Sequence, residues 1–137
     1  MSYLLDTNVI SELRKGERAD ANVRAWFSEL ADEEIFLSVL TIGEVRRGVE
    51  NVRLRDPKAA AALDSWLARL GEAHRKRILP VDRAVAEEWG RMNVPDPLPV
   101  VDGLLAATAK VIGLTFATRN VADVKGSGVE LLNPFST

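Results

Sequence analysis

The sequence of 137 residues has no cysteine and a single histidine. Without cysteine there is no disulfide, no thiolate metal site and no cysteine nucleophile, and a reducing compartment such as the cytoplasm is the expected location. The histidine, His74, lies in the basic segment 74–77, and we expect it to be a solvated surface residue. The count excludes a catalytic pair of histidines, and a Ser–His–Asp triad has no other histidine to use.

Long hydrophobic runs and a strong net charge are also absent. No apolar run approaches the roughly 20 residues that cross a bilayer, and Asp6 comes too early for a signal peptide, so we expect no membrane segment. The formal net charge of −2 is unlike that of a protein that coats DNA. Divalent cations bound to clustered acids would make it positive, so charge alone neither supports nor excludes a nucleic-acid substrate.

The apolar residues fall into short runs that alternate with amphipathic helical segments. The expected strands are 3–5, 35–38, 78–81, 114–117 and 129–132. Strands that alternate with helices predict a parallel sheet with helices on both faces. We therefore expect one domain, 1–137, of the α/β class, with three α/β/α layers around a central, mainly parallel five-stranded sheet.

Four acids stand at comparable places in this pattern. Asp6 directly follows the first expected strand, and Glu44 lies early in the helix after the second. Asp102 opens a helix after a proline-rich loop, and Asp123 lies in the loop after the fourth strand. Because the carboxyl ends of parallel strands meet at one edge, the four can converge there. Clustered carboxylates need a cation, and hard oxygen ligands select Mg²⁺ or Mn²⁺, which suits phosphodiester hydrolysis by an activated water.

Structural roles are open for several of these residues. Asp6 could simply cap the helix that follows it, and Thr41-x-x-Glu44 matches a capping box. Arg46 and Arg47 could meet backbone phosphates near the acids, or they could pair with acids on their own helix.

Five segments carry a resemblance to a known family. They are 3–10 (YLLDTNVI), 38–48 (SVLTIGEVRRG), 102–109 (DGLLAATA), 117–123 (ATRNVAD) and 128–135 (GVELLNPF). Each is weak by itself, but together they resemble PIN domains, the small metal-dependent nucleases that include the VapC toxins. The segments follow one another in the family's order and span the chain.

The resemblance implies roles for individual residues. Asp6, Glu44 and Asp102 match the three main metal-binding acids, and Asp123 matches a fourth, more variable one. Thr7, Thr118 and Asn120 are implied as supporting residues, with Asn120 an alternative to Asp123 in completing the metal site. One departure is Val124, where relatives often carry an aromatic residue.

The function implied is a Mg²⁺-dependent endoribonuclease, with Mn²⁺ as a substitute, that acts as the toxin of a VapBC-type pair. Its implied partners are an RNA substrate, which Arg119, Arg46 and Arg47 would bind, and an antitoxin of VapB type. The antitoxin's tail would lie over a groove and place a basic side chain in the acidic site. A homodimer, and a higher toxin–antitoxin assembly, would be the working form.

Three other functions fit the sequence less well. An RNA-processing PIN nuclease without a toxin role would use the same acids. A catalytically silent module that binds RNA or protein would be expected to lack some acids, and here all four positions are occupied. A phosphatase with Asp6 as nucleophile usually needs a second Asp two positions later, where this chain has Asn8.

Overall fold

In the computed structural model, which describes residues 1–136, five strands form one parallel sheet. The strands are β1 (Tyr3–Leu5), β2 (Ile35–Ser38), β3 (Ile78–Leu79), β4 (Thr115–Ala117) and β5 (Leu131–Leu132). Their order across the sheet is β3-β2-β1-β4-β5, so the predicted five-stranded parallel sheet is confirmed. Strands β3 and β5 are shorter than predicted, and β3 ends before Pro80, which has no N–H to donate to a ladder.

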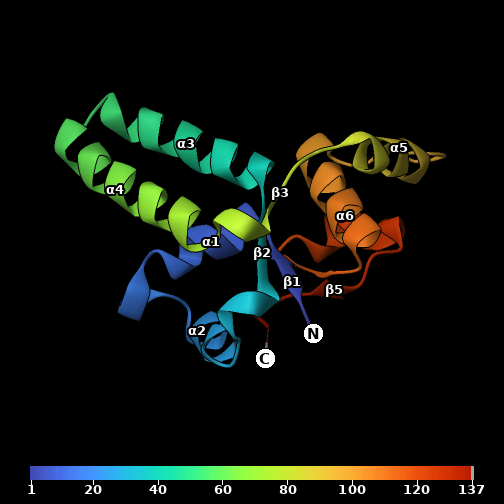
Figure 1. Ribbon diagram of the computed structural model, residues 1–137, viewed down its shortest axis with the longest axis horizontal. Helices are drawn as coiled ribbons and strands as arrows, with labels where there is room; N and C mark the ends of the chain where they lie inside the picture. Colours follow the sequence, from blue (N-terminus) through green and yellow to red (C-terminus); the bar gives the residue numbers. More distant parts are fainter. Residues whose placement is uncertain (137) are drawn as a thin grey trace.

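Helices cover both faces of the sheet, as the predicted three-layer arrangement requires (Figure 1). The α-helices are α1 (Thr7–Leu13), α2 (Ala21–Ser28), α3 (Val39–Arg53), α4 (Pro57–Ala73), α5 (Arg83–Met92) and α6 (Val100–Ile112). Helices α3 and α4 form a hairpin that projects to one side, and α5 and α6 lie together on the other (Figure 1). Within residues 1–136, no helix is both long enough and apolar enough to cross a membrane.

Strand β1 separates two hydrophobic clusters. Tyr3 and Leu5 pack with residues of α1 to α4, and Leu4 packs with residues of α6. Successive side chains of a strand point to opposite faces, so a strand covered by helices on both sides is apolar at every position. This burial explains why the first apolar run of the sequence does not alternate with polar residues.

Several helices begin or end at residue types that favour helix caps. Asp56 Oδ1 accepts a hydrogen bond from the Ala59 N–H at 3.1 Å, directly before Pro57 in the first turn of α4. Asp82 Oδ1 caps α5 by accepting from the Val85 N–H at 3.0 Å. Gly113 ends α6 with φ of 83°, a left-handed conformation that favours glycine.

The capping box considered for Thr41 and Glu44 is wrong. Helix α3 begins two residues before Thr41, and its cap is Ser38, whose Oγ accepts from the Leu40 N–H at 3.0 Å. Thr41 therefore lies inside the helix, where its hydroxyl is fully buried and has no hydrogen-bond partner among residues 1–136. Glu44 is released from capping and is available for other contacts.

The strand order places a crevice beside β1. The chain passes from β1 outward to β2 and β3, then crosses to β4 and β5 on the other side of β1. In open α/β sheets, ligands bind outside the carboxyl ends of the strands at such a reversal. Asp6 directly follows β1 and Thr118 directly follows β4, so both residues stand at this crevice.

Replacing Thr41 with Val should raise the free energy of unfolding by about 1 kcal/mol, because valine keeps the shape and removes a buried hydroxyl without a partner. Urea unfolding measures this change. The matched control is Thr108→Val, since Thr108 is equally buried but its hydroxyl donates to Leu104 O at 2.8 Å. The control should be no more stable than the wild type, and a loss of stability in Thr41→Val would contradict the prediction.

Candidate active site

The four acids singled out in the sequence come from four separate elements and share one electrostatic field. Asp6 lies between β1 and α1, Glu44 lies on α3, and Asp102 is in the first turn of α6. Asp123 is in a 3₁₀ helix, Val121–Ser127, and is exposed. Burial is the main cause that raises the pKa of the Asp102 carboxyl to about 6, and the negative charges of the other three acids contribute to the rise.

Asp6 is the most enclosed of these acids, with 3% of its surface exposed. Its Oδ1 accepts from the Thr7 N–H at 2.7 Å, so it does cap α1. Its Oδ2 accepts from Thr118 Oγ1 at 2.6 Å and from Asn8 Nδ2 at 3.3 Å. Burial raises the pKa of Asp6 and the charge of Glu44 adds to the rise, while the hydrogen bonds oppose it. Capping and membership of the acidic site are therefore compatible roles.

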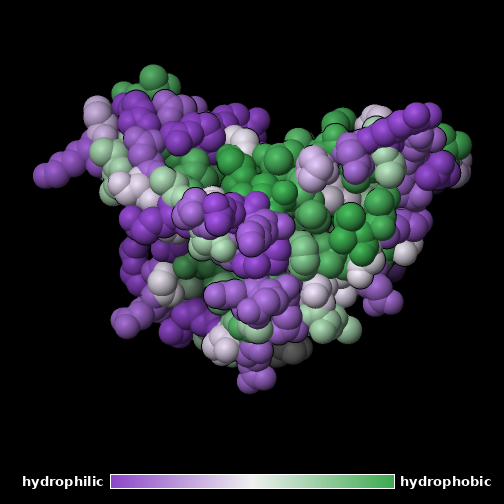
Figure 2. Space-filling view, viewed as in Figure 1, coloured by the Kyte–Doolittle hydropathy of each residue, from purple (hydrophilic) through white to green (hydrophobic). Residues whose placement is uncertain are grey.

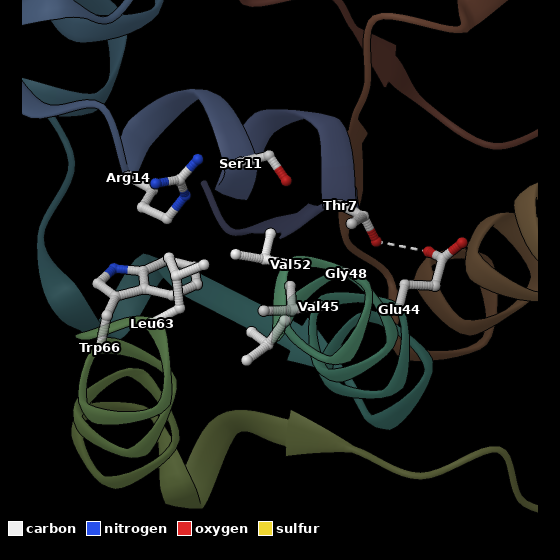
Figure 3. A pocket seen from close by; sticks show the side chains of 10 residues that line it. Thr7, Ser11, Arg14, Glu44, Val45, Gly48, Val52, Leu63 and Trp66 are labelled. Carbon is white, nitrogen blue, oxygen red and sulfur yellow. Dashed lines mark hydrogen bonds between the residues drawn. The ribbon is translucent and has the colours of Figure 1, made fainter. Parts of the chain in front are cut away.

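Glu44 is held by the residue that follows Asp6. Thr7 Oγ1 donates to Glu44 Oε1 at 2.5 Å, joining the start of α1 to α3 (Figure 3). Both residues stand at the end of a cleft between α1, α3 and α4. The cleft is also lined by Ser11, Arg14, Val45, Gly48, Val49, Val52, Leu63 and Trp66 (Figure 3). The acidic site thus opens onto a mainly apolar cleft.

Thr118 and Asn8 join the two ends of the chain at the site. Thr118 is fully buried, and its hydroxyl accepts from the Asn120 N–H at 2.9 Å while it donates to Asp6. Asn8 makes a second link between the two ends of the chain, because its Oδ1 accepts from the Arg119 N–H at 3.3 Å. Sequence reasoning missed this role of Asn8. The signal available was its place two residues after Asp6, at the carboxyl edge of the sheet.

The four acids supply carboxylate oxygens that can bind a cation, and basic side chains in the described part of the chain do not occupy them. Among residues 1–136, no Lys, Arg or His side chain forms a salt bridge with Asp6, Glu44, Asp102 or Asp123. Within the same residues, no three acidic or histidine side chains are gathered into a ready-made metal cage. The oxygen donors fit Mg²⁺ or Mn²⁺, and a bound cation would offset the mutual repulsion of these carboxylates.

The basic residues expected near the site are in different situations. Arg46 Nη1 pairs with Glu50 of its own helix at 3.0 Å and with Asp64 of α4 at 2.7 Å, so its guanidinium has a structural role. Arg47 is exposed on α3. Arg119 is exposed beside Thr118, and its guanidinium lies 3.9 Å from the centre of the Phe135 ring.

His74 takes no part in the acidic site. It is half-buried rather than fully solvated, and its Nδ1 lies 3.1 Å from Leu70 O. Its neighbours in a second cleft include Phe27 and Trp66. The expectation of a solvated surface residue is therefore wrong, because His74 lines this cleft together with Leu13 of α1 and Phe27 of α2.

The raised pKa of Asp102 predicts a pH-dependent stability in protein stripped of metal with EDTA. Between its usual value of 3.8 and about 6, the folded state binds more protons at Asp102 than the unfolded state. Stability from this group is therefore present at low pH and is lost as pH rises through that window. After allowance for solvent screening, the loss should be on the order of 1–2 kcal/mol.

Urea unfolding at pH 4 to 7 measures this effect as the difference between the wild type and Asp102→Asn. The difference isolates Asp102, because acids elsewhere, such as Glu88 with its lowered pKa, titrate in both proteins. The variant should gain stability relative to the wild type as pH rises. Parallel profiles for the two proteins would contradict the raised pKa.

Comparisons with known proteins agree with this arrangement. Residues 3–122 match the family model of the PIN domain. The chain is 33% identical over 137 residues to Toxin FitB of Neisseria gonorrhoeae, covering 96% of this chain and 97% of that protein. It is 32% identical over 138 residues to VapC ribonuclease Y4jK of Sinorhizobium fredii, covering 96% of each.

A solved structure gives the same result in three dimensions. The crystal structure of FitAcB from Neisseria gonorrhoeae matches with a TM-score of 0.89 at 33% identity, covering 98% of this chain and 99% of that chain. The family match spans most of the sequence and includes Asp6, Glu44 and Asp102. The chain belongs to the PIN domain family.

Proposed function

We propose that this chain is a Mg²⁺-dependent endoribonuclease, with Mn²⁺ able to replace Mg²⁺, and the toxin of a VapBC-type toxin–antitoxin pair. The observation that carries the proposal is the acidic site at the carboxyl edge of the sheet. Burial and the charges of the neighbouring carboxylates raise the pKa of Asp102, and no basic side chain forms a salt bridge with these acids among residues 1–136. The names of the relatives, Toxin FitB and VapC ribonuclease Y4jK, support the toxin and RNA parts of the proposal.

The chain's own residues would prepare the site for hydrolysis. Asp6, Glu44, Asp102 and Asp123 are the residues that would hold the cation. A divalent cation bound there supplies an activated water and offsets the negative charge that develops on the phosphate. Thr118 and Asn8 fix the direction of the Asp6 carboxylate, and Thr7 fixes that of Glu44. Hydrolysis breaks one P–O bond of the RNA backbone as the water oxygen joins the phosphorus.

Partner binding would use the surfaces around this site. The cleft that begins at Thr7 and Glu44 has apolar walls, including Val45 and Trp66, and it suits the tail of a VapB-type antitoxin with a basic side chain directed at the acids. Between the α3–α4 hairpin and the α5–α6 pair the surface is hollowed, and hydrophobic side chains gather there (Figure 2). We propose this hollow face as the contact of a homodimer, within a larger toxin–antitoxin assembly.

Purified protein should cut RNA into discrete products in Mg²⁺ or Mn²⁺ and lose this activity in EDTA. Asp6→Asn and Asp102→Asn should each cut RNA at least about 100-fold more slowly than the wild type, because each substitution removes a charged oxygen donor. Both should fold, since a neutral amide relieves repulsion between acids. Gel electrophoresis of total RNA and transfer RNA measures the products.

The control for that experiment is Asp32→Asn, an exposed acid of the segment before β2, purified in the same way. Its cleavage should equal that of the wild type. Equal cleavage by all four proteins would identify a contaminating nuclease and contradict the assignment of the acids.

Arg119 and Arg46 should differ in their effect on RNA binding. Arg119 has no salt-bridge partner among residues 1–136, so Arg119→Ala should weaken RNA binding and reduce the steepness of its salt dependence by about one unit of slope. Arg46→Ala should leave RNA binding unchanged, because Arg46 is committed to Glu50 and Asp64. Fluorescence anisotropy on the Asp102→Asn background, at several salt concentrations, measures both, and the reverse order would refute the distinction.

A further inference from the structure

Asp102 stands in a helix turn that has no side-chain cap of its own. The residue before α6 is Pro99, and no side chain accepts a hydrogen bond from the first N–H groups of the helix. The carbonyl of Pro99 accepts from the Gly103 N–H at 2.8 Å, which closes the first turn around Asp102. The direction of this turn must therefore be set by what it packs against.

The surface beneath the turn comes from α5 and the proline-rich loop. A Cβ atom at Gly103 would lie 3.2 Å from Nε1 of Trp89 and 3.3 Å from Cβ of Leu98. These distances are tighter than most contacts of a Cβ atom, so a larger residue at position 103 would require Trp89 or Leu98 to shift by a few tenths of an ångström. The indole Nε1 of Trp89 is buried there without a hydrogen-bond partner among residues 1–136.

One side chain joins the two residues that form this seat. Asn93 Nδ2 donates to the carbonyl of Trp89 at 2.7 Å, and Asn93 Oδ1 accepts from the Leu98 N–H at 2.8 Å. Asn93 is half-buried, so both bonds are partly shielded from water. The amide thus ties the last turn of α5 to the end of the loop, directly before α6 begins.

We propose that Asn93, acting through the contact of Gly103 with Trp89 and Leu98, is a positioning residue that holds Asp102 in place to bind the cation. The inference rests on the proposed function. Asn93 itself is not a metal ligand. It ties Trp89 to Leu98, the backbone of Gly103 approaches both of these residues closely, and Asp102 is the residue before Gly103 in the same first turn of α6.

A purely structural clamp would act differently. It would stabilise the packing of α5 on α6 and change the melting temperature, while the folded protein would bind a cation as before. A positioning residue must also change the affinity of the folded protein for the cation. Partners that orient ligand residues typically contribute 10- to 100-fold to metal affinity, and we expect about tenfold for Asn93, which acts at one remove.

The test is a Mn²⁺ titration of the purified full chain, followed by the electron paramagnetic resonance signal of free Mn²⁺, with thermal melting of each protein. Asn93→Ala should bind Mn²⁺ about tenfold more weakly than the wild type. Gly103→Ala does not change Asn93, but its added methyl group presses against Trp89 and Leu98 and should displace the first turn of α6. This variant should therefore also bind Mn²⁺ more weakly. Asn22→Ala is the matched control, because Asn22 makes a comparable bond, to Phe135 O at 2.9 Å, away from the acids.

The variant Asp102→Asn distinguishes failure of the Asn93 positioning role from failure of the proposed metal site. If it weakens Mn²⁺ binding but folded Asn93→Ala binds like the wild type, the positioning role is wrong and the proposed function stands. If Asp102→Asn itself binds like the wild type, the metal site of the proposed function fails and the positioning role fails with it. Should Asn93→Ala not fold, Gly103→Ala decides, and wild-type affinity in that variant overturns the inference.

Discussion

The hydrogen bond from Thr118 Oγ1 to Asp6 Oδ2, 2.6 Å long, joins residues that are 112 positions apart in the sequence. It spans the crevice between β1 and β4, the neighbouring parallel strands at which the order of strand addition reverses. Thr118 is itself held in place, because its hydroxyl oxygen accepts from the Asn120 N–H and its backbone N–H donates to Leu132 O at 2.9 Å. The buried carboxylate is therefore oriented by the sheet itself. Asp102 and Glu44 are brought to it by helices that pack on opposite faces.

The places of Asp6 and Asp102 in the fold could be predicted from the sequence because each lies at a feature that the sequence marks clearly. Asp6 ends an apolar run that is buried on both sides, and Asp102 follows a loop in which proline prevents helix. The start of α3 was harder, because Ser38 and Thr41 are both good caps and the residues between them are apolar. Ser38 is where pairing with β3 ends, and that tertiary fact decided between them.

The basic residues could not be assigned from the sequence, because their partners depend on packing between separate elements. Arg46 pairs with Glu50 on its own helix, one of the two roles that the sequence leaves open for it. Its shorter bond is to Asp64 on α4, across the helix hairpin. Arg53 meets the same Asp64 at 2.7 Å. Arg119 stacks on Phe135, which follows β5. In each case the partner of the arginine depends on which helix or strand lies beside it in the fold. The spacing of residues in the sequence does not show which elements become neighbours.

The distribution of charge links the fold to the chemistry. Acids outside the site, such as Glu50, Asp64 and Glu88, are matched by arginine or lysine, so the formal charge of −2 hides a local excess at the crevice. An RNA phosphate would be repelled by that excess, since both are negative and the crevice is partly shielded from water. A cation between them would reverse the sign of the local interaction, and it would also offset the repulsion that, together with burial, raises the pKa of Asp102. Cation binding and substrate binding should therefore be coupled at this site, and a displaced Asp102 carboxylate would weaken both at once.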